Sequence, residues 1–426
     1  MSPQELAETA VDKVRDSAKT IRTGKWKEVL PYLGPAFVAS VAYMDPGNFG
    51  TNIQGGSDFN YDLLWVLLWS NLMAILIQAL SAKLGIVTGK TLPQNCRQHF
   101  SRPTNLFFWI MAEVAAMATD LAEFLGGALG FYLLFHIPMF HAALLTGVVV
   151  FVILAVERHG FRKLEYVIMG FVGMIAISYV IEVVLAKPEW SQILYHVTVP
   201  KITANSIYVA VGMLGATVMP HVVYLHSALV QHRLTTDDLS HKTKHYRFEV
   251  IDVLLAMNSA WLINSAMIIM SAAVFFRNGI PVQSIEQAHE TLTPLLGKFS
   301  SLAFGIALLC SGLSSSTVGT MAGQVIIQGF LNIRFSIFLR RFITMIPALV
   351  VIGIGLDPLK ILILSQVVLS FALPFALIPL IMFTKKREIM GEHANKPVTT
   401  WLAIIVAAII IFLNCLLLYQ VFGGEF

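Results

Sequence analysis

The chain of 426 residues is 56% hydrophobic and only 13% charged. Soluble domains usually carry about 25% charged residues, so this composition excludes an ordinary soluble enzyme and predicts an all-α polytopic membrane protein. The formal net charge of +4 says nothing by itself, because the distribution of charge matters more than its sum. We expect no nucleic-acid partner. The three cysteines are scattered and predict neither a disulfide framework nor a thiolate metal site.

The first 28 residues are polar and charged, which argues against a secretory signal peptide. Leu6, Ala10, Val14, Ala18 and Ile21 lie near helical spacing. A short amphipathic helix on the membrane surface and a plain polar tail both fit this pattern. We assign residues 1–30 to a cytoplasmic N-terminal segment and give it no function.

Eleven apolar segments follow, each near the roughly 20 residues that a membrane-spanning helix needs. They cover about residues 31–57, 61–84, 104–135, 140–156, 163–186, 203–230, 247–276, 299–328, 336–355, 358–383 and 398–422. If the N-terminus is inside and the chain alternates, 24 of the 29 Lys and Arg residues fall on the inner side. This bias predicts a multi-pass protein of the inner (plasma) membrane, with a cytoplasmic N-terminus and an extracytoplasmic C-terminus.

Two of these segments are interrupted. Segment 1 is broken at Asp45-Pro46-Gly47-Asn48 and segment 6 around Gly215 to Pro220. Five segments separate the breaks, so the two halves enter the membrane with opposite polarity. This pattern predicts inverted repeats over 31–186 and 187–383, a remainder at 384–426, and a binding site at the midplane.

Asp45 and Asn48 place two hard oxygen ligands at the first break. Pro46 lacks an N–H group and Gly47 permits unusual dihedrals, so local carbonyls such as that of Ala42 are free to coordinate an ion. A capped kink is the structural alternative. Ionisable residues inside membrane spans are usually functional, which favours an ion site.

Met219, Pro220 and His221 lie at the second break. A thioether suits manganese, iron, cobalt, nickel or cadmium and matches magnesium or calcium poorly, so Met219 beside oxygen ligands predicts a transition-metal site. For His221 we favour a role in proton transfer, because imidazole titrates near neutrality. A metal-ligand role and a core hydrogen bond remain open for this histidine.

Segment 3 carries Glu113, Asp120 and Glu123 on one helical face. Three carboxylates in a span suggest a stepwise proton route. Static ion pairs with Arg340 and Arg341 of segment 9 are the alternative, and both readings can hold together.

Other polar residues in the spans are weaker signals. Gln366 in segment 10 and Asn71 in segment 2 could each supply an oxygen to the site, and Gln366 is the better candidate. Asn258 and Asn264 are expected to form bonds between helices. The run Gly126-Gly127-Ala128 suggests close helix approach for gating.

Three tracts together resemble the Nramp family of proton-coupled divalent metal transporters, over about residue 30 to the end. They are Asp45-Pro46-Gly47-Asn48 with Met219-Pro220-His221, the stretch after segment 8 from Gly323-Gln324 to Gln328-Gly329-Phe330, and Thr119-Asp120-Leu121-Ala122-Glu123. Many members read Met-Pro-His-Asn where this chain has Val222, a departure that could shift proton coupling. Magnesium-transporting members lack the methionine, so Met219 argues against that branch.

The resemblance implies a LeuT-like fold, with two inverted five-helix repeats, an eleventh helix, and helices 1 and 6 broken at the midplane. It implies that Asp45, Asn48, Met219 and the Ala216 carbonyl bind the metal, with Ala42 joining in some states. The proton network that it implies consists of Asp45, His221, Glu123, Asp120, Arg340 and Arg341.

We therefore expect a secondary-active importer of Mn²⁺ or Fe²⁺, and also of Cd²⁺ and Co²⁺, coupled to proton symport. It would be no enzyme, need no cofactor and work as a monomer in the bilayer. A sodium- or proton-coupled amino acid transporter of the same fold is the first alternative, although Asp45 speaks against it. A metal channel or sensor is the second. An ATP-driven pump is disfavoured because the sequence has no P-loop.

Overall fold

The computed structural model describes residues 32–156, 160–233, 239–334 and 336–421. Within these ranges the chain is helical and has no strand. The suggested surface helix in residues 1–28 lies outside them. Nine of the described helices are long and apolar enough to cross a membrane.

The eleven apolar segments correspond to helices in chain order. They are α3 (Pro35–Ala42) with α4 (Pro46–Phe59), α5 (Leu64–Thr88), α7 (Arg102–Phe135), α8 (Met139–Val156), α9 (Phe161–Ala186), α11 (Ile207–Thr217) with α12 (Pro220–Leu229), α13 (Leu239–Val274), α15 (Lys298–Leu331), α16 (Ile337–Gly353), α17 (Pro358–Lys385) and α19 (Pro397–Val421). The stretch from Gly323 to Phe330 lies inside α15, and not after it as expected. The helix ends at Leu331, about one turn beyond residue 328, where the apolar segment was expected to end.

Both predicted breaks are present. Tyr43, Met44 and Asp45 separate α3 from α4, and Val218 and Met219 separate α11 from α12. Each second half begins with a proline, which is favourable at the first helical position because no N–H is needed there.

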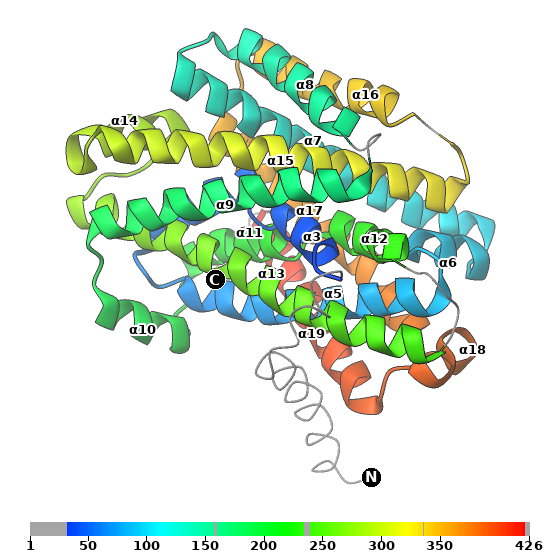
Figure 1. Cartoon of the computed structure of the whole chain (residues 1–426). Helices are drawn as coiled ribbons and strands as arrows, with labels where there is room; N and C mark the ends of the chain where they lie inside the picture. Colours follow the sequence, from blue (N-terminus) through cyan, green and yellow to red (C-terminus); the bar gives the residue numbers. More distant parts are fainter. Residues whose placement is uncertain (1–31, 157–159, 234–238, 335, 422–426) are drawn as a thin grey trace.

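Short helices join the spans. α10 (Trp190–Thr198) and α14 (Ile285–Leu296) lie at one end of the bundle, and α6 (Leu92–His99) and α18 (Arg387–Met390) lie at the other (Figure 1). We call these the α10 end and the α6 end. The sequence reading did not predict these four helices, because their apolar stripes are too short for a hydropathy window.

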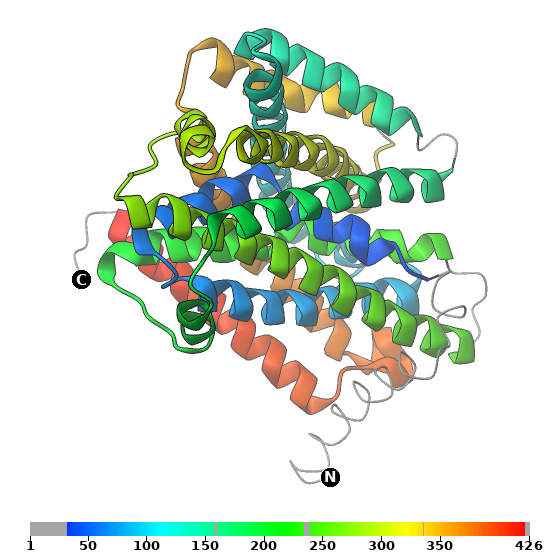
Figure 2. The same ribbon diagram turned by 60° about the vertical axis from the view of Figure 1, so that its left-hand side comes forward.

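α15 packs along α7 and α9 in the interior, while α8 and α16 lie side by side at one flank and α19 lies at the opposite flank (Figures 1 and 2). Small residues permit the closest approach: a Cβ at Gly312 of α15 would lie 2.2 Å from the Gly127 nitrogen of α7. The outer helices expose large apolar side chains, such as Val152, Val184 and Phe412. An apolar exterior around buried polar groups is the arrangement expected of a membrane protein.

Candidate metal site

Asp45 is the N-cap of α4 and is completely buried. Its Oδ1 accepts hydrogen bonds from the Asn48 backbone N–H at 2.8 Å and from Asn48 Nδ2 at 2.7 Å. Its Oδ2 accepts one from Gln366 Nε2 of α17 at 3.2 Å. A helix N-terminus and two amide groups thus surround the carboxylate, which lies at the centre of the bundle.

Asn48 links the two broken helices. Its Nδ2 also donates to the carbonyl oxygen of Ala216 at 3.1 Å, at the end of α11. The same NH₂ group therefore contacts a carboxylate oxygen and a carbonyl oxygen from different breaks. A cation in its place would meet the same two oxygens, and rotation of the amide would add a third ligand from Oδ1.

Two further oxygens at this place make no hydrogen bond within the described part of the chain. They are Asn48 Oδ1 and Gln366 Oε1, both fully buried. Buried polar atoms are nearly always hydrogen-bonded, so these two oxygens are candidates to bind a ligand beside the carboxylate. Gln366 also requires Gly47, because a Cβ there would lie 1.5 Å from Gln366 Nε2.

Met219 occupies the second break as the N-cap of α12, where its side chain is buried. The residues preferred at an N-cap are Ser, Thr, Asp and Asn, whose side chains accept hydrogen bonds from the first N–H groups of the helix. Met219 makes no capping bond, so capping does not explain this residue type. On the other break, the Ala42 carbonyl accepts a hydrogen bond from the Asp45 N–H at 3.3 Å.

Neighbouring helices hold the carbonyls of the first break. Asn264 of α13 donates to the Tyr43 oxygen at 2.6 Å, and Ser311 of α15 donates to the Met44 oxygen at 2.6 Å. Asn264 was predicted as an interhelical contact, whereas Ser311 was missed because a serine in an apolar helix carries no distinctive signal. Asn71 is not brought to the site, since it donates to Asn258 at 3.1 Å.

The carboxylates of α7 face α15 and α16. Glu113 pairs with Arg340 at 2.9 Å, and the fully buried Asp120 pairs with Arg341 at 3.7 Å. Glu123 is also fully buried, with Ser315 beside it. The three acids thus form a row from the α6 end toward Asp45, with two arginines alongside.

Glycines on α15 make this row possible. A Cβ at Gly319 would lie 2.2 Å from Glu123 Oε2, and a Cβ at Gly323 would lie 2.1 Å from the Arg340 guanidinium. His221 approaches the same row from α12, with its Nδ1 3.1 Å from Thr119 Oγ1. His221 therefore contacts α7 at the residue next to Asp120, and its role in a proton route stays a prediction.

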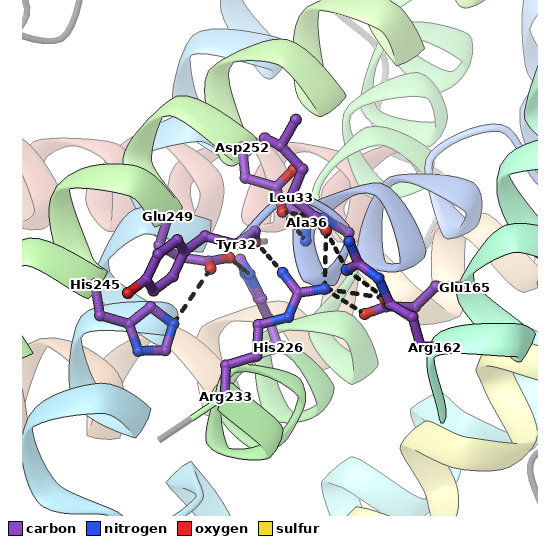
Figure 3. Close-up of polar contacts among 11 residues, drawn as sticks. Tyr32, Leu33, Ala36, Arg162, Glu165, His226, Arg233, His245, Glu249 and Asp252 are labelled. Atoms are coloured by element: carbon purple, nitrogen blue, oxygen red, sulfur yellow. Dashed lines mark hydrogen bonds and ion pairs between the residues drawn. The ribbon is translucent and has the colours of Figure 1, made fainter. Parts of the chain in front are cut away.

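A second buried polar network near the α6 end was not predicted (Figure 3). Asp252 of α13 accepts hydrogen bonds from the N–H groups of Gly34 at 3.0 Å and Ala36 at 2.8 Å, which caps the start of α3. Arg233 donates to the Leu33 carbonyl at 2.8 Å and pairs with Glu165 of α9 at 2.9 Å. The start of α3 is thus fixed to helices from both halves of the chain.

A chain of hydrogen bonds runs from Tyr43 at the break to Glu249, which precedes Asp252 by three residues on α13. Gln78 of α5 donates to the Tyr43 hydroxyl at 2.5 Å, and its Oε1 lies 2.8 Å from His226 Nδ1. His226 Nε2 lies 2.9 Å from Glu249 of α13 (Figure 3). The buried acids of segments 5 and 7 were the sequence signal for this network, but their partners are distant in the chain.

A membrane bundle in which two discontinuous helices meet at the centre is the arrangement of secondary transporters with the LeuT fold. The fold is shared with MhsT, solved in complex with L-phenylalanine, at a TM-score of 0.60 and 13% identity over 89% of this chain and 98% of that one. It is also shared with Mhp1, a nucleobase-cation-symport-1 family transporter, at a TM-score of 0.59 and 12% identity over 91% of this chain and 89% of that one.

The chain belongs to the Nramp family, the natural resistance-associated macrophage protein-like proteins, whose family model matches residues 36–420. It is 56% identical to the divalent metal cation transporter MntH of Caldanaerobacter subterraneus subsp. tengcongensis, over 94% of this chain and 95% of the relative. It is 50% identical to MntH of Deinococcus radiodurans, over 93% and 92%.

The solved structures agree with this assignment. A mutant of the Eremococcus coleocola manganese transporter superposes with a TM-score of 0.85 at 34% identity, over 93% of this chain and 89% of that one. The prediction of an all-α LeuT-like fold with broken helices 1 and 6 is confirmed. The chain is a multi-pass membrane transporter and not an enzyme.

Proposed function

We propose that the chain imports divalent transition metal ions, with Mn²⁺ or Fe²⁺ as substrate, together with protons. The observation that carries this proposal is the Asn48 amide, which bridges the Asp45 carboxylate and the Ala216 carbonyl across the two breaks. Its relatives include a divalent metal cation transporter and a manganese transporter, which supports the substrate class.

The metal is held in this proposal by Asp45, Asn48, the Ala216 carbonyl and Met219, with Ala42 and Gln366 joining in some states. The oxygens match the charge of a divalent cation, and the Met219 sulfur selects softer ions over Mg²⁺ and Ca²⁺. Because a ligand must be deprotonated, metal binding expels any proton from Asp45.

The proton leaves along α7. His221 and Glu123 receive it, Asp120 and Glu113 carry it onward, and Arg340 and Arg341 stabilise the charged forms of these acids. The ion pairs from Arg340 to Glu113 and from Arg341 to Asp120 support this route, because a relay group needs a partner that adjusts its proton affinity.

Alternating access accounts for the network at the α6 end. Asp252, Arg233 and Glu165 hold the start of α3 by hydrogen bonds and an ion pair. Release of the start of α3 would open the metal site toward the α6 end. The excess of basic residues at the α6 end supports a cytoplasmic location for it, with the C-terminus extracytoplasmic. We further propose repeat boundaries at 31–186 and 187–383 and a functional monomer.

The experiment is uptake of Mn²⁺ into proteoliposomes that contain the purified protein and a pH-sensitive dye. Saturable manganese entry with internal acidification is the expected result. Entry without acidification would remove the proton route through α7. Without manganese entry in folded protein, the amino acid transporter becomes the better reading, and titration with metals against amino acids would decide between them.

A further inference from the structure

An open groove of about 480 Å³ lies at the α6 end, outside the metal site. Its lining consists of Gly89, Lys90, Gln94, Arg97 and Gln98. Two of these residues are cationic, two are amides and none is acidic. The groove is therefore suited to an anion that accepts several hydrogen bonds.

The positive charge of this region is not balanced by its own stretch of sequence. No Asp or Glu occurs between Asp62 and Glu113, whereas Lys83, Lys90, Arg97 and Arg102 all lie in that interval. The end of α17 lies near the same end of the bundle, since the Phe383 ring lies 5.4 Å from that of His99. Lys385 and Lys386 follow Phe383 and are not part of the groove lining.

The groove is built on a fixed helix. α6 has a complete capping box between Thr91 and Gln94, and the Leu92 N–H donates to Ser227 of α12 at 2.9 Å. Lys90 Nζ donates to Gln98 Oε1 at 2.6 Å, which sets the position of the ammonium group. A lysine and an arginine have three and five N–H donors, so capacity for an anion remains beyond these bonds.

An apolar surface begins directly after the groove. α7 starts three residues beyond α6, and its first turns expose Leu106, Phe107 and Ile110. An exposed apolar strip at the start of a membrane span is where acyl chains pack. Free phosphate has no apolar group that could pack on this strip, whereas a phospholipid has both a phosphate and acyl chains.

We propose that this groove binds the phosphate headgroup of an anionic phospholipid, with the acyl chains along the first turns of α7. Lys90 and Arg97 pair with the phosphate, and the amides of Gln94 and Gln98 donate to its oxygens. The proposal rests on the cytoplasmic location of the α6 end, because basic side chains near that leaflet attract anionic lipids.

The test compares binding of phosphatidylglycerol and phosphatidylcholine to the purified full chain by native mass spectrometry. The test variant is Lys90→Gln/Arg97→Gln. The matched control is Lys385→Gln/Lys386→Gln, which removes two charges from the same end outside the groove. Mn²⁺ binding, measured separately, reports that each variant is folded. The lipid readout needs no transport, so its failure is distinguishable from failure of the transport proposal.

Wild type and control are expected to bind phosphatidylglycerol in preference to phosphatidylcholine. In the groove variant the ratio of phosphatidylglycerol to phosphatidylcholine binding should fall by about tenfold or more. Glycerol phosphate in excess should not displace the lipid, because it lacks acyl chains. Equal preference in the groove variant and the control would overturn the proposal, and so would full displacement by glycerol phosphate. Absence of any preference in the wild type would also overturn it.

Discussion

His226 and Glu249 form a fully buried pair, with Nε2 2.9 Å from Oε1. Gln78 uses its N–H to reach Tyr43, so its oxygen must accept from His226 Nδ1. Nε2 then either carries a second proton or accepts one from a protonated Glu249. In either case the pair holds one titratable proton. Because Glu249 precedes Asp252, which binds the start of α3, by three residues on α13, we expect transport to depend on the protonation of this pair.

Glu249→Gln tests this relationship. The glutamine can still donate to Nε2, but the pair can no longer release a proton. We expect folded protein whose manganese uptake is slower and varies less with cytoplasmic pH than that of the wild type. The measurement is the uptake rate in proteoliposomes over a range of internal pH. A pH profile identical to that of the wild type would contradict the shared proton.

Asp45→Asn should abolish uptake. The substitution keeps the size of the side chain and one acceptor oxygen, but it removes the charge that balances the cation. We expect Mn²⁺ affinity to fall by at least about a hundredfold, because a lost charged ligand costs several kcal/mol. Isothermal titration and uptake measure the two effects, and retained affinity would exclude Asp45 as a ligand.

Met219→Ala should relax metal selectivity while uptake of Mn²⁺ continues at a reduced rate. Water in place of sulfur gives a site of oxygens only, which suits Ca²⁺ and Mg²⁺. The measurement is competition by these two ions against manganese uptake. If the variant excludes them as well as the wild type does, the sulfur has no part in selection.

Gly47→Ala should inactivate the transporter, whereas Gly50→Ala is the matched control on the same helix. A Cβ at Gly47 would lie 1.5 Å from Gln366 Nε2, but one at Gly50 would meet nothing closer than Leu359 Cδ1 at 3.4 Å. Displacement of Gln366 removes a hydrogen bond from Asp45. The double variant Gly47→Ala/Gln366→Ala relieves the clash but does not restore this bond, so its uptake should stay impaired. Uptake equal in the two single variants would contradict the argument.

Gly312→Ala should lower the stability of the bundle. Its Cβ would lie 2.2 Å from the Gly127 nitrogen, which cannot move without its helix, and such overpacking costs about 1–3 kcal/mol. Gly173→Ala on α9 meets nothing within 4 Å and serves as the control. Thermal unfolding in detergent measures both. If the two variants had the same Tm, the close packing of α7 on α15 at Gly312 would not be required for stability.

A bulky residue at Gly127 tests gating, provided that the variant is shown to be folded. Its Cβ would lie 2.6 Å from Thr146 Cγ2 of α8. If α7 moves against its neighbours during transport, Gly127→Leu should slow uptake and leave Mn²⁺ affinity unchanged. Unchanged uptake in the folded variant would remove this idea.

The sequence revealed the elements whose signals are local. Asp45-Pro46-Gly47-Asn48 and Met219-Pro220 mark the breaks, because proline and glycine interrupt helices wherever they occur. Hydropathy located the spans. The pairing of Arg340 and Arg341 with the acids of α7 followed from the cost of burying unpaired charge.

The rest depends on contacts between distant segments. Nothing local shows that Asp252 caps α3 or that Arg233 reaches Glu165, since 68 or more residues separate the partners. Ser311 is another such case, because its role follows only from the carbonyl opposite it. The amphipathic α6 was missed since its buried side chains, Leu92, Pro93 and Cys96, form too short a stripe.

The shortness of α3 has a thermodynamic consequence. It has eight residues, about 12 Å of helix, with Asp252 bound at its start and Asn264 bound just beyond its end. So short a rigid rod cannot shift at one end alone. In the proposed mechanism, the free energy of ion binding at Asp45 is therefore linked to the equilibrium at Arg233, and linkage is reciprocal. A substitution that weakens the contacts of Arg233 should therefore change the affinity for the ion, although Arg233 is not at the ion site. By the same linkage, ion binding should change the equilibrium between held and released Arg233 by the same factor.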